Sequence, residues 1–474
     1  MKNNQKKEFL KNLWINILSL GVRQIFVFIL NIMGSIYSAR VLTAADYGVY
    51  AILTYLSIFL VTFGDAGFAA SLIRSRTQPT DREYSAIFTM QFILVLLILL
   101  IFIGFSSVIT HEGLNNYLLG AIFLSFFITS FSTIPIVKME RKLQFKRIAI
   151  IDLLQAITFN VTLITFLYYD FNVISIAIAF IFRAITGFLL SYIMQPTKLN
   201  IIFDWHIVRN NISFGMSYQG VKIVSLLKDS ITPVFIGLYL GMSDVGIASW
   251  ATTTAAYPVL CLFIFQRLLM PTFANLQAEP EKLKKLVEIS VLVANGLVAV
   301  FSITMLILIE PLILLIFGEK WSVALPIYLV LWSCNVFVPT AVVCISLLNA
   351  LGHSKINLYY SLLWMIGTWV LAIPMVITFG VFGYAIATFV IQMTNLLLYK
   401  STLNKFDFNI AVNVMPIWIL VSICSLPLAF LNYLLPPDTV IQLALYVVGS
   451  MVLTVSAVII YGYSKIKSLF EIYK

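Results

Sequence analysis

The chain has 474 residues, of which 61% are hydrophobic and only 11% are charged, with a formal net charge of +10 at neutral pH. A soluble globular protein carries about 25% charged residues, so this composition excludes an ordinary water-soluble fold and indicates a protein built for a lipid bilayer. The positive charge does not indicate a nucleic-acid partner, because it lies mostly in the short connectors between apolar stretches and reflects membrane topology.

Fourteen apolar stretches follow one another along the chain, each close to the ~20 residues that a helix needs to cross a bilayer. The expected helices cover residues 13–38, 46–64, 84–109, 116–137, 146–168, 171–193, 210–240, 245–266, 286–309, 324–347, 356–378, 381–400, 410–432 and 439–463. The first stretch is too long for the apolar core of a cleavable signal peptide, and we expect it to remain as an anchor. The sequence therefore predicts an all-α polytopic membrane protein.

The lysines and arginines indicate the orientation, because cytoplasmic loops of membrane proteins carry an excess of these residues. With the N-terminus in the cytoplasm, 24 of the 30 basic residues fall in cytoplasmic loops or tails, and only Arg40 and Lys320 fall outside. Both termini are then cytoplasmic, and every loop is too short to hold a catalytic domain. Four cations remain within the apolar stretches: Arg23, Arg183, Lys222 and Lys228.

Two short patterns recur in the two halves of the chain. The segment Leu42–Gly48 resembles Leu240–Gly246 at an offset of 198 residues, and Gly21-Val22-Arg23 matches Gly220-Val221-Lys222 at an offset of 199. Because each half has an even number of helices, we expect parallel repeats that are related by an axis along the membrane normal. The predicted organisation is an N-lobe (1–198), a C-lobe (199–402) and two extra helices (403–474).

Four segments carry a resemblance to a known family. They are the connector Ile136–Ala149, the turn Asp65-Ala66-Gly67 with Ala70–Arg74, the stretch Glu310–Trp321, and Asn349–Gly352. The first holds an Arg-x-Leu-x-Phe-Lys pattern and the third holds Phe-Gly-Glu-Lys-Trp. Together they resemble the polysaccharide transporter group of the multidrug/oligosaccharidyl-lipid/polysaccharide exporter superfamily. The resemblance implies two pseudo-symmetric six-helix lobes around a central cavity.

The same resemblance implies a flippase. Members of this group move undecaprenyl-diphosphate-linked oligosaccharides from the cytoplasmic to the outer leaflet of the bacterial cytoplasmic membrane by alternating access, for O-antigen, capsule or exopolysaccharide assembly. The implied partners are the lipid-linked oligosaccharide, membrane lipids and the polysaccharide polymerase machinery. No cofactor is expected, although transport could be coupled to protons or sodium.

Two of the buried cations are the main candidates for holding the cargo. A charged side chain inside the bilayer is costly and is usually paired or faces a water-filled cavity. Arginine suits a diphosphate through bidentate donors, whereas lysine offers a point charge. Arg23 and Lys222 lie in equivalent helices, and we expect both to face the cargo. Alternatively, each pairs with a buried carboxylate such as Asp152 or Asp229.

Three further cations are weaker candidates. Arg183 and Lys228 lie in apolar stretches, but Lys228 is about 120° around its helix from Lys222, so the two cannot line one narrow face. Arg267 closes an apolar stretch at the cytoplasmic surface. Its candidacy comes from resemblance to relatives that flip peptidoglycan precursors, where the equivalent helix contributes basic residues to the cavity, and an ordinary topological anchor is the alternative.

Uncharged and acidic residues complete the candidate site. Gln24 and Asn31 are seven residues apart on one helix face, where they could bind glycan hydroxyls or tie the first helix to a neighbour. Buried carboxylates whose pKa is shifted can carry protons or sodium ions during transport. The candidates for such ion coupling are Asp152 and Asp229, with Asp65 as a third carboxylate that could lie in the interface instead.

Two other classes of function fit less well. A multidrug antiporter of the same superfamily exports cations and needs an acidic cavity, yet the first helix carries Arg23 and no carboxylate. A membrane enzyme would need a large outer loop or a cluster of catalytic carboxylates. Neither is present in the sequence, and His111, His206 and His353 are scattered without metal-ligand spacing. We therefore expect a transporter rather than an enzyme, with no metal site.

Overall fold

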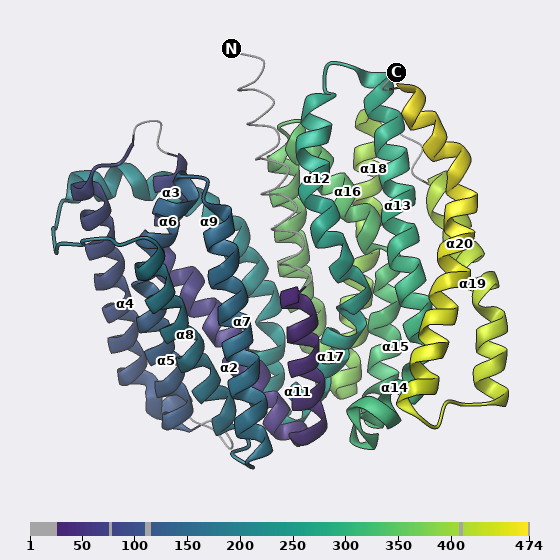
Figure 1. The fold of residues 1–474 in the computed structure, drawn as a ribbon, viewed down its shortest axis with the longest axis horizontal. Coiled ribbons are helices and arrows are strands. Elements are labelled where there is room, and N and C mark those ends of the chain that lie inside the picture. Colours follow the sequence, from purple (N-terminus) through teal and green to yellow (C-terminus); the bar gives the residue numbers. More distant parts are fainter. Residues whose placement is uncertain (1–25, 75–77, 110–114, 407–410, 473–474) are drawn as a thin grey trace. The chain divides into compact units, whose positions relative to one another are not determined.

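The computed structural model describes residues 26–74, 78–109, 115–406 and 411–472, and these form helices joined by short connectors, without a β-strand (Figure 1). Nine of the described helices are long and apolar enough to cross a membrane, or ten if the bent pair Glu319–Val336 and Val338–Ala350 is one span. The all-α architecture with many membrane spans is confirmed. The count of fourteen spans stays a prediction.

The chain divides into two compact units. Unit 1 comprises Met1–Pro233 and Gly241–Gly246, and unit 2 comprises Val234–Leu240 and Ile247–Lys474. These units reflect contacts, whereas the predicted lobes reflect sequence repeats. The predicted lobe boundary at residue 198 therefore stays a prediction.

Unit 1 is built from the first helices of the chain. Its described elements are Phe26–Val41, α2 (Ala44–Asp65), α3 (Phe68–Arg74), α4 (Asp81–Ile109), α5 (Asn116–Ser130), α6 (Thr133–Arg141), α7 (Phe145–Tyr168), α8 (Ile174–Met194), α9 (Trp205–Asp229) and the start of α11 (Met242–Ala256). Helix α2 begins where the Thr43 hydroxyl accepts a hydrogen bond from the Asp46 backbone N–H at 3.1 Å and donates one to Asp46 Oδ2 at 2.7 Å. Such a reciprocal cap satisfies backbone groups that the first turn leaves unpaired.

Unit 2 contains the later helices. They are α10 (Gly237–Tyr239), the rest of α11, α12 (Leu262–Asn275), α13 (Pro280–Ile307), α14 (Ile309–Leu312), α15 (Leu325–Ser333), α16 (Val338–Ala350), α17 (Ser354–Met393), α18 (Asn395–Phe406), α19 (Ala411–Leu434) and α20 (Val440–Ile472). Helix α17 consists of two helices that meet at Gly380, whose φ of +59° lies outside the helical range. The sequence predicts a boundary between residues 378 and 381, at the same place.

The long stretch predicted as a helix over residues 210–240 is interrupted. Helix α9 ends at Asp229 and is followed by a π-helix, Ile231–Ile236, which contains Pro233. Proline removes a backbone donor and displaces the preceding turn, so a change of helix type at this position is expected.

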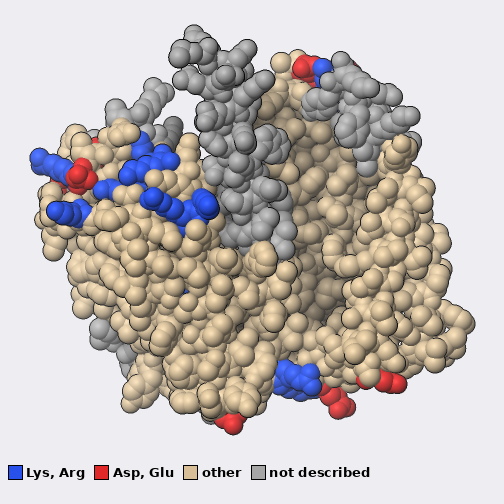
Figure 2. All heavy atoms as spheres, in the orientation of Figure 1, with Lys and Arg blue, Asp and Glu red and all other residues tan. Residues whose placement is uncertain are grey.

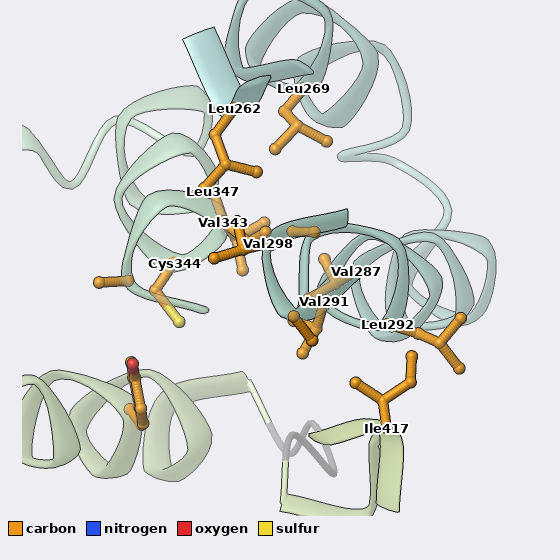
Figure 3. Packing of buried hydrophobic residues seen from close by; sticks show 14 of the residues in the cluster. Leu262, Leu269, Val287, Val291, Leu292, Val298, Val343, Cys344, Leu347 and Ile417 are labelled. Carbon is orange, nitrogen blue, oxygen red and sulfur yellow. The ribbon is translucent and has the colours of Figure 1, made fainter. Parts of the chain in front are cut away.

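The core of unit 2 lies between α12, α13, α16 and α19 (Figure 3). Aliphatic side chains such as Val298, Val343 and Leu347 point toward one another there and are fully buried. One amide crosses this core: Asn295 donates to Thr340 Oγ1 at 2.9 Å and accepts from Trp418 Nε1 at 3.1 Å. Buried polar groups inside a bilayer need such internal partners, because lipid offers none.

The two repeated segments Leu42–Gly48 and Leu240–Gly246 each end in an Asp-x-Gly pattern, and these two patterns meet within unit 1. A Cβ on Gly48 of α2 would lie 2.0 Å from the carbonyl oxygen of Met242, and a Cβ on Gly246 of α11 would lie 1.9 Å from the carbonyl oxygen of Ala44. Gly48 and Gly246 are 198 residues apart, as are Ala44 and Met242, which is the offset of the sequence repeat. The contact is therefore reciprocal, and glycine is needed because the two backbones touch.

We expect Gly48→Ala to destabilise the protein by about 1–3 kcal/mol, because the new methyl group would overlap a backbone oxygen that cannot easily move. The measurement is thermal unfolding of the detergent-solubilised protein. Gly120→Ala is the matched control, since a Cβ on Gly120 in α5 has nothing within 4 Å. It should be neutral or stabilising by up to ~1 kcal/mol. An equal loss of stability in Gly48→Ala and Gly120→Ala would contradict the close contact between the two backbones.

Candidate functional site

Five charged side chains of unit 1 form one electrostatic cluster. They come from five helices: Asp65 of α2, Glu140 of α6, Asp152 of α7, Arg183 of α8 and Lys222 of α9. We call these residues the unit 1 charge cluster. Three carboxylates and two cations meet within a part of the chain made largely of apolar helices, where unpaired charge is expensive.

Asp65 is the last residue of α2 and interacts with three residues. Its Oδ1 accepts a hydrogen bond from the Ala69 backbone N–H at 3.1 Å, and its Oδ2 accepts one from Gln219 Nε2 at 2.9 Å. Lys222 interacts with it electrostatically. The bond to Ala69 depends on a tight turn, in which Ala66 and Gly67 both have positive φ angles. Asp65 thus joins the turn before α3 to helix α9.

Gln219 is almost fully buried beside this carboxylate, with 2% of its surface exposed. Its Nε2 donates to Asp65 and, at 3.4 Å, to the carbonyl oxygen of Thr62. Its Oε1 accepts no hydrogen bond from any described residue. A buried amide oxygen without a donor is costly, and such an atom is suited to accept a proton donor or a cation.

Lys222 lies one turn further along α9, and its side chain is exposed. Its ammonium group interacts electrostatically with both Asp65 and Glu140. Lys222 therefore interacts with two carboxylates and remains accessible. A lysine in this position can exchange one anionic partner for another at low cost, since part of its hydration is retained.

Arg183 and Asp152 form the other end of the cluster. Arg183 is near the middle of α8, its side chain is exposed, and its guanidinium carbon lies 5.8 Å from the centroid of the Phe159 ring. It interacts electrostatically with Asp152 of α7 and with Tyr50 of α2. Glu140 interacts with Asp152 and Asp65, and so links this end to Lys222.

Two predicted residues pair with each other outside the cluster. Lys228 Nζ lies 3.2 Å from Asp229 Oδ1, and the side chains of both are at least one-third exposed. Asp229 is therefore a partner of Lys228. This arrangement agrees with the helical spacing, which separates Lys222 and Lys228 around α9.

Asn31 ties its helix to a neighbour. Asn160 of α7 donates to Asn31 Oδ1 at 3.1 Å and to the carbonyl oxygen of Ala156 at 2.9 Å. The helices approach closely here, because a Cβ on Gly34 would lie 2.0 Å from Asn160 Oδ1. The structure thus gives Asn31 an interhelical bond, which is the second of its two predicted roles.

Three predicted residues cannot be placed in the site. Arg23 and Gln24 lie outside the described residues, and Arg267 lies in α12, although its side chain is also outside the description. Their predicted roles stay predictions.

Sequence reasoning missed two members of this region. Glu140 falls in the connector Ile136–Ala149, among lysines and arginines, and is not among the residues that the sequence predicts for the site. Gln219 directly precedes the Gly-Val-Lys pattern, where the first copy of the repeat has Leu20. That replacement of an apolar residue by an amide is the signal that could have identified Gln219.

If Lys222 and Asp65 interact, their substitutions should have non-additive effects on the free energy of unfolding. In a double-mutant cycle with Lys222→Met and Asp65→Asn, we expect a coupling of about 0.5–3 kcal/mol, measured from unfolding in mixed detergent and SDS. The exposed pair Lys228 and Asp229 is the matched control and should show less than about 1 kcal/mol. Additive effects for Lys222 and Asp65 would show that these groups do not interact.

A family model described as polysaccharide biosynthesis protein matches residues 38–326. The chain is 22% identical over 342 residues to the succinoglycan biosynthesis transport protein ExoT of Rhizobium meliloti, which covers 70% of this chain and 67% of that protein. It is 24% identical over 299 residues to the teichuronic acid biosynthesis protein TuaB of Bacillus subtilis, covering 58% of each chain. It is 22% identical over 301 residues to the lipopolysaccharide biosynthesis protein WzxC of Escherichia coli, covering 61% of this chain and 60% of that protein. The chain thus spans about three-fifths of the length of the last two relatives.

Solved structures show the same fold at low sequence identity. The lipid II flippase MurJ, in an inward closed conformation, matches 94% of this chain and 99% of its own with a TM-score of 0.76 and 14% identity. An inward-facing multidrug resistance MATE family transporter of the MOP superfamily matches 83% of this chain and 99% of its own, with a TM-score of 0.60 and 16% identity. The resemblance found in the sequence is confirmed, and the chain belongs to the polysaccharide biosynthesis protein family.

Proposed function

We propose that this chain is a flippase for lipid-linked oligosaccharides. The observation that carries the proposal is the family match over residues 38–326, which includes both Asp-x-Gly copies and the unit 1 charge cluster. The relatives are named for succinoglycan transport and for teichuronic acid and lipopolysaccharide biosynthesis, so a carbohydrate is common to their names. A protein with the same fold is named a lipid II flippase, which adds a lipid to the cargo.

The proposed cargo is an oligosaccharide joined to undecaprenol through a diphosphate. Its head group cannot cross hydrocarbon without partners, because unsatisfied polar and charged groups are expensive there. Lys222 supplies an accessible cation on helix α9, next to carboxylates that would compete with an incoming phosphate for it. Arg23 stays the predicted second cation. The isoprenoid tail would remain in lipid throughout.

The proposed cycle is alternating access, in which the head-group site opens first to the cytoplasmic leaflet and then to the outer one. In this proposal the protein lies in the bacterial cytoplasmic membrane with both termini in the cytoplasm, as the distribution of lysine and arginine indicates. The flipped unit then passes to polymerase machinery on the outer side. The protein makes and breaks no covalent bond, so it acts as a transporter and not as an enzyme.

Coupling to a cation is part of the proposal. The unit 1 charge cluster has three carboxylates and two cations. Gln219 binds Asp65 through its Nε2, and the buried Oε1 of the same amide accepts no hydrogen bond from a described residue. A phosphate that binds Lys222 would free Asp65 and Glu140 to take up a proton or a sodium ion. Cargo and cation would then bind in one charge network, and each would favour the binding of the other, which links the two fluxes.

The acidic residues also support the second candidate function, a multidrug antiporter of the same superfamily. Asp65, Glu140 and Asp152 together form the acidic environment that a cationic drug requires. The family match favours the flippase, because the matching model describes polysaccharide biosynthesis proteins. The two functions differ in the charge of the cargo, and a transport measurement separates them.

We expect Lys222→Met to block flipping in cells. In a deletion strain, the variant at wild-type expression should leave lipid-linked oligosaccharide on the cytoplasmic leaflet, with flipping reduced about ten- to a hundredfold by the loss of one charge-assisted contact. Leaflet-resolved labelling of lipid-linked sugars is the measurement. Lys228→Met is the matched control, because it removes the same charge from the same helix at the exposed pair with Asp229.

Wild-type behaviour of Lys222→Met would remove this lysine from the site. Unchanged lipid-linked intermediates in the deletion strain would contradict the flippase function itself.

We expect Asp152→Asn to uncouple transport from its driving ion. In proteoliposomes, an imposed proton or sodium gradient should accelerate flipping by the wild type, while Asp152→Asn keeps the rate seen without a gradient. Asp229→Asn should respond as the wild type does, since Asp229 pairs with Lys228 outside the cluster. A full gradient response by Asp152→Asn would remove Asp152 from the coupling site.

A further inference from the structure

An extended strap crosses one end of unit 1. The strap comprises residues 195–204 and joins α8 to α9. The backbone N–H groups of Asn200 and Ile202 donate to Ser85 Oγ at 3.3 Å and to Thr89 Oγ1 at 2.9 Å. Ser85 and Thr89 are one turn apart on α4, so the strap is fixed along this helix.

Apolar side chains of the strap point away from the protein. Ile201 is 82% exposed, Phe203 is 66% exposed, and Trp205, the first residue of α9, is 54% exposed. These three residues alternate along the chain, and the bound residue Ile202 lies between two of them. An exposed row of this kind, ending in tryptophan, is typical of protein that lies at the boundary between acyl chains and head groups.

A basic recess lies next to this row. Its volume is about 1050 Å³, and Arg82, Lys138, Lys198, Ser85, Asn200 and Tyr192 are among its lining residues. The lining contains three cations and one carboxylate, Asp81. Figure 2 shows the lysine and arginine side chains gathered at this end of unit 1.

The cations of the recess are held in place but are not fully neutralised. Arg82 pairs with Asp204 of the strap at 3.0 Å, and Lys138 pairs with Asp81 at 3.0 Å and lies 4.5 Å from the centroid of the Tyr84 ring. The Asp81 side chain is 88% exposed, so a stronger anion could replace it at little cost. Lys198 is exposed at the rim.

We propose that this recess binds the head group of an anionic phospholipid from the surrounding membrane. The phosphate lies between Lys138 and Lys198, Ser85 and Asn200 provide hydrogen-bonding groups, and the acyl chains run along Ile201 and Phe203. The cations match the phosphate of such a lipid, and the exposed apolar row beside them matches its acyl chains. A soluble anion would use only the cations. The site is independent of the cargo, because it lies on the strap and not in the unit 1 charge cluster.

Native mass spectrometry of the full-length chain in detergent tests this proposal, with phosphatidylglycerol or phosphatidylcholine added in steps. We expect tighter binding of phosphatidylglycerol, and a loss of about tenfold in its apparent affinity in the double variant Lys138→Gln/Lys198→Gln. The matched control is Lys285→Gln/Lys355→Gln, which removes the same charge from unit 2 at exposed positions. It should change the affinity less than twofold.

A second variant separates a lipid site from a site for any phosphate. Ile201→Ser/Phe203→Ser leaves the charge unchanged and should also weaken phosphatidylglycerol binding several-fold, and inorganic phosphate at 10-fold excess should not compete. This variant carries the test if Lys138→Gln/Lys198→Gln does not fold. Equal binding of the two lipids, equal losses in the unit 2 control, or full competition by inorganic phosphate would each overturn the proposal.

Discussion

The lysine of helix α9 and the carboxylates that interact with it are the constraint on which the site depends. Lys222 interacts with Asp65 and Glu140, and Asp65 is fixed in turn by Gln219 and by the backbone of α3. Each group would be costly alone in hydrocarbon, and together they stabilise a charge that stays accessible. In the proposed function, this accessible cation is the group that meets the anionic head group of the cargo.

Much of the fold could be predicted because the bilayer restricts the chain to few solutions. Apolar stretches of sufficient length predict the spans, and the observed α2, α4, α7, α8 and α13 begin and end within several residues of the expected positions. The internal breaks were harder to predict. The π-helix at Pro233 and the interruption between α5 and α6 depend on local backbone geometry, which hydropathy does not report.

The site was less predictable, because its members are far apart in the sequence. Asp65 and Gln219 are 154 residues apart and form a direct hydrogen bond, and no local sequence pattern predicts such a pairing. The sequence did identify Lys222, Arg183 and Asp152 as charges in apolar stretches, and the structure brings these three into one cluster with Asp65. It also predicted the repeat whose two glycines, Gly48 and Gly246, meet at equivalent positions. The two copies of the repeat differ at one polar position, because the second copy has Gln219 where the first has Leu20.

The most direct test of the central claim uses the purified chain alone in proteoliposomes. A fluorescent undecaprenyl-diphosphate-linked oligosaccharide is placed in both leaflets, and a membrane-impermeant quencher reports the fraction that reaches the outside. The flippase account predicts that nearly all of the fluorescence is quenched, whereas empty liposomes keep about half of it. A protected fraction equal to that of empty liposomes, together with export of a cationic dye by the same preparation, would contradict it.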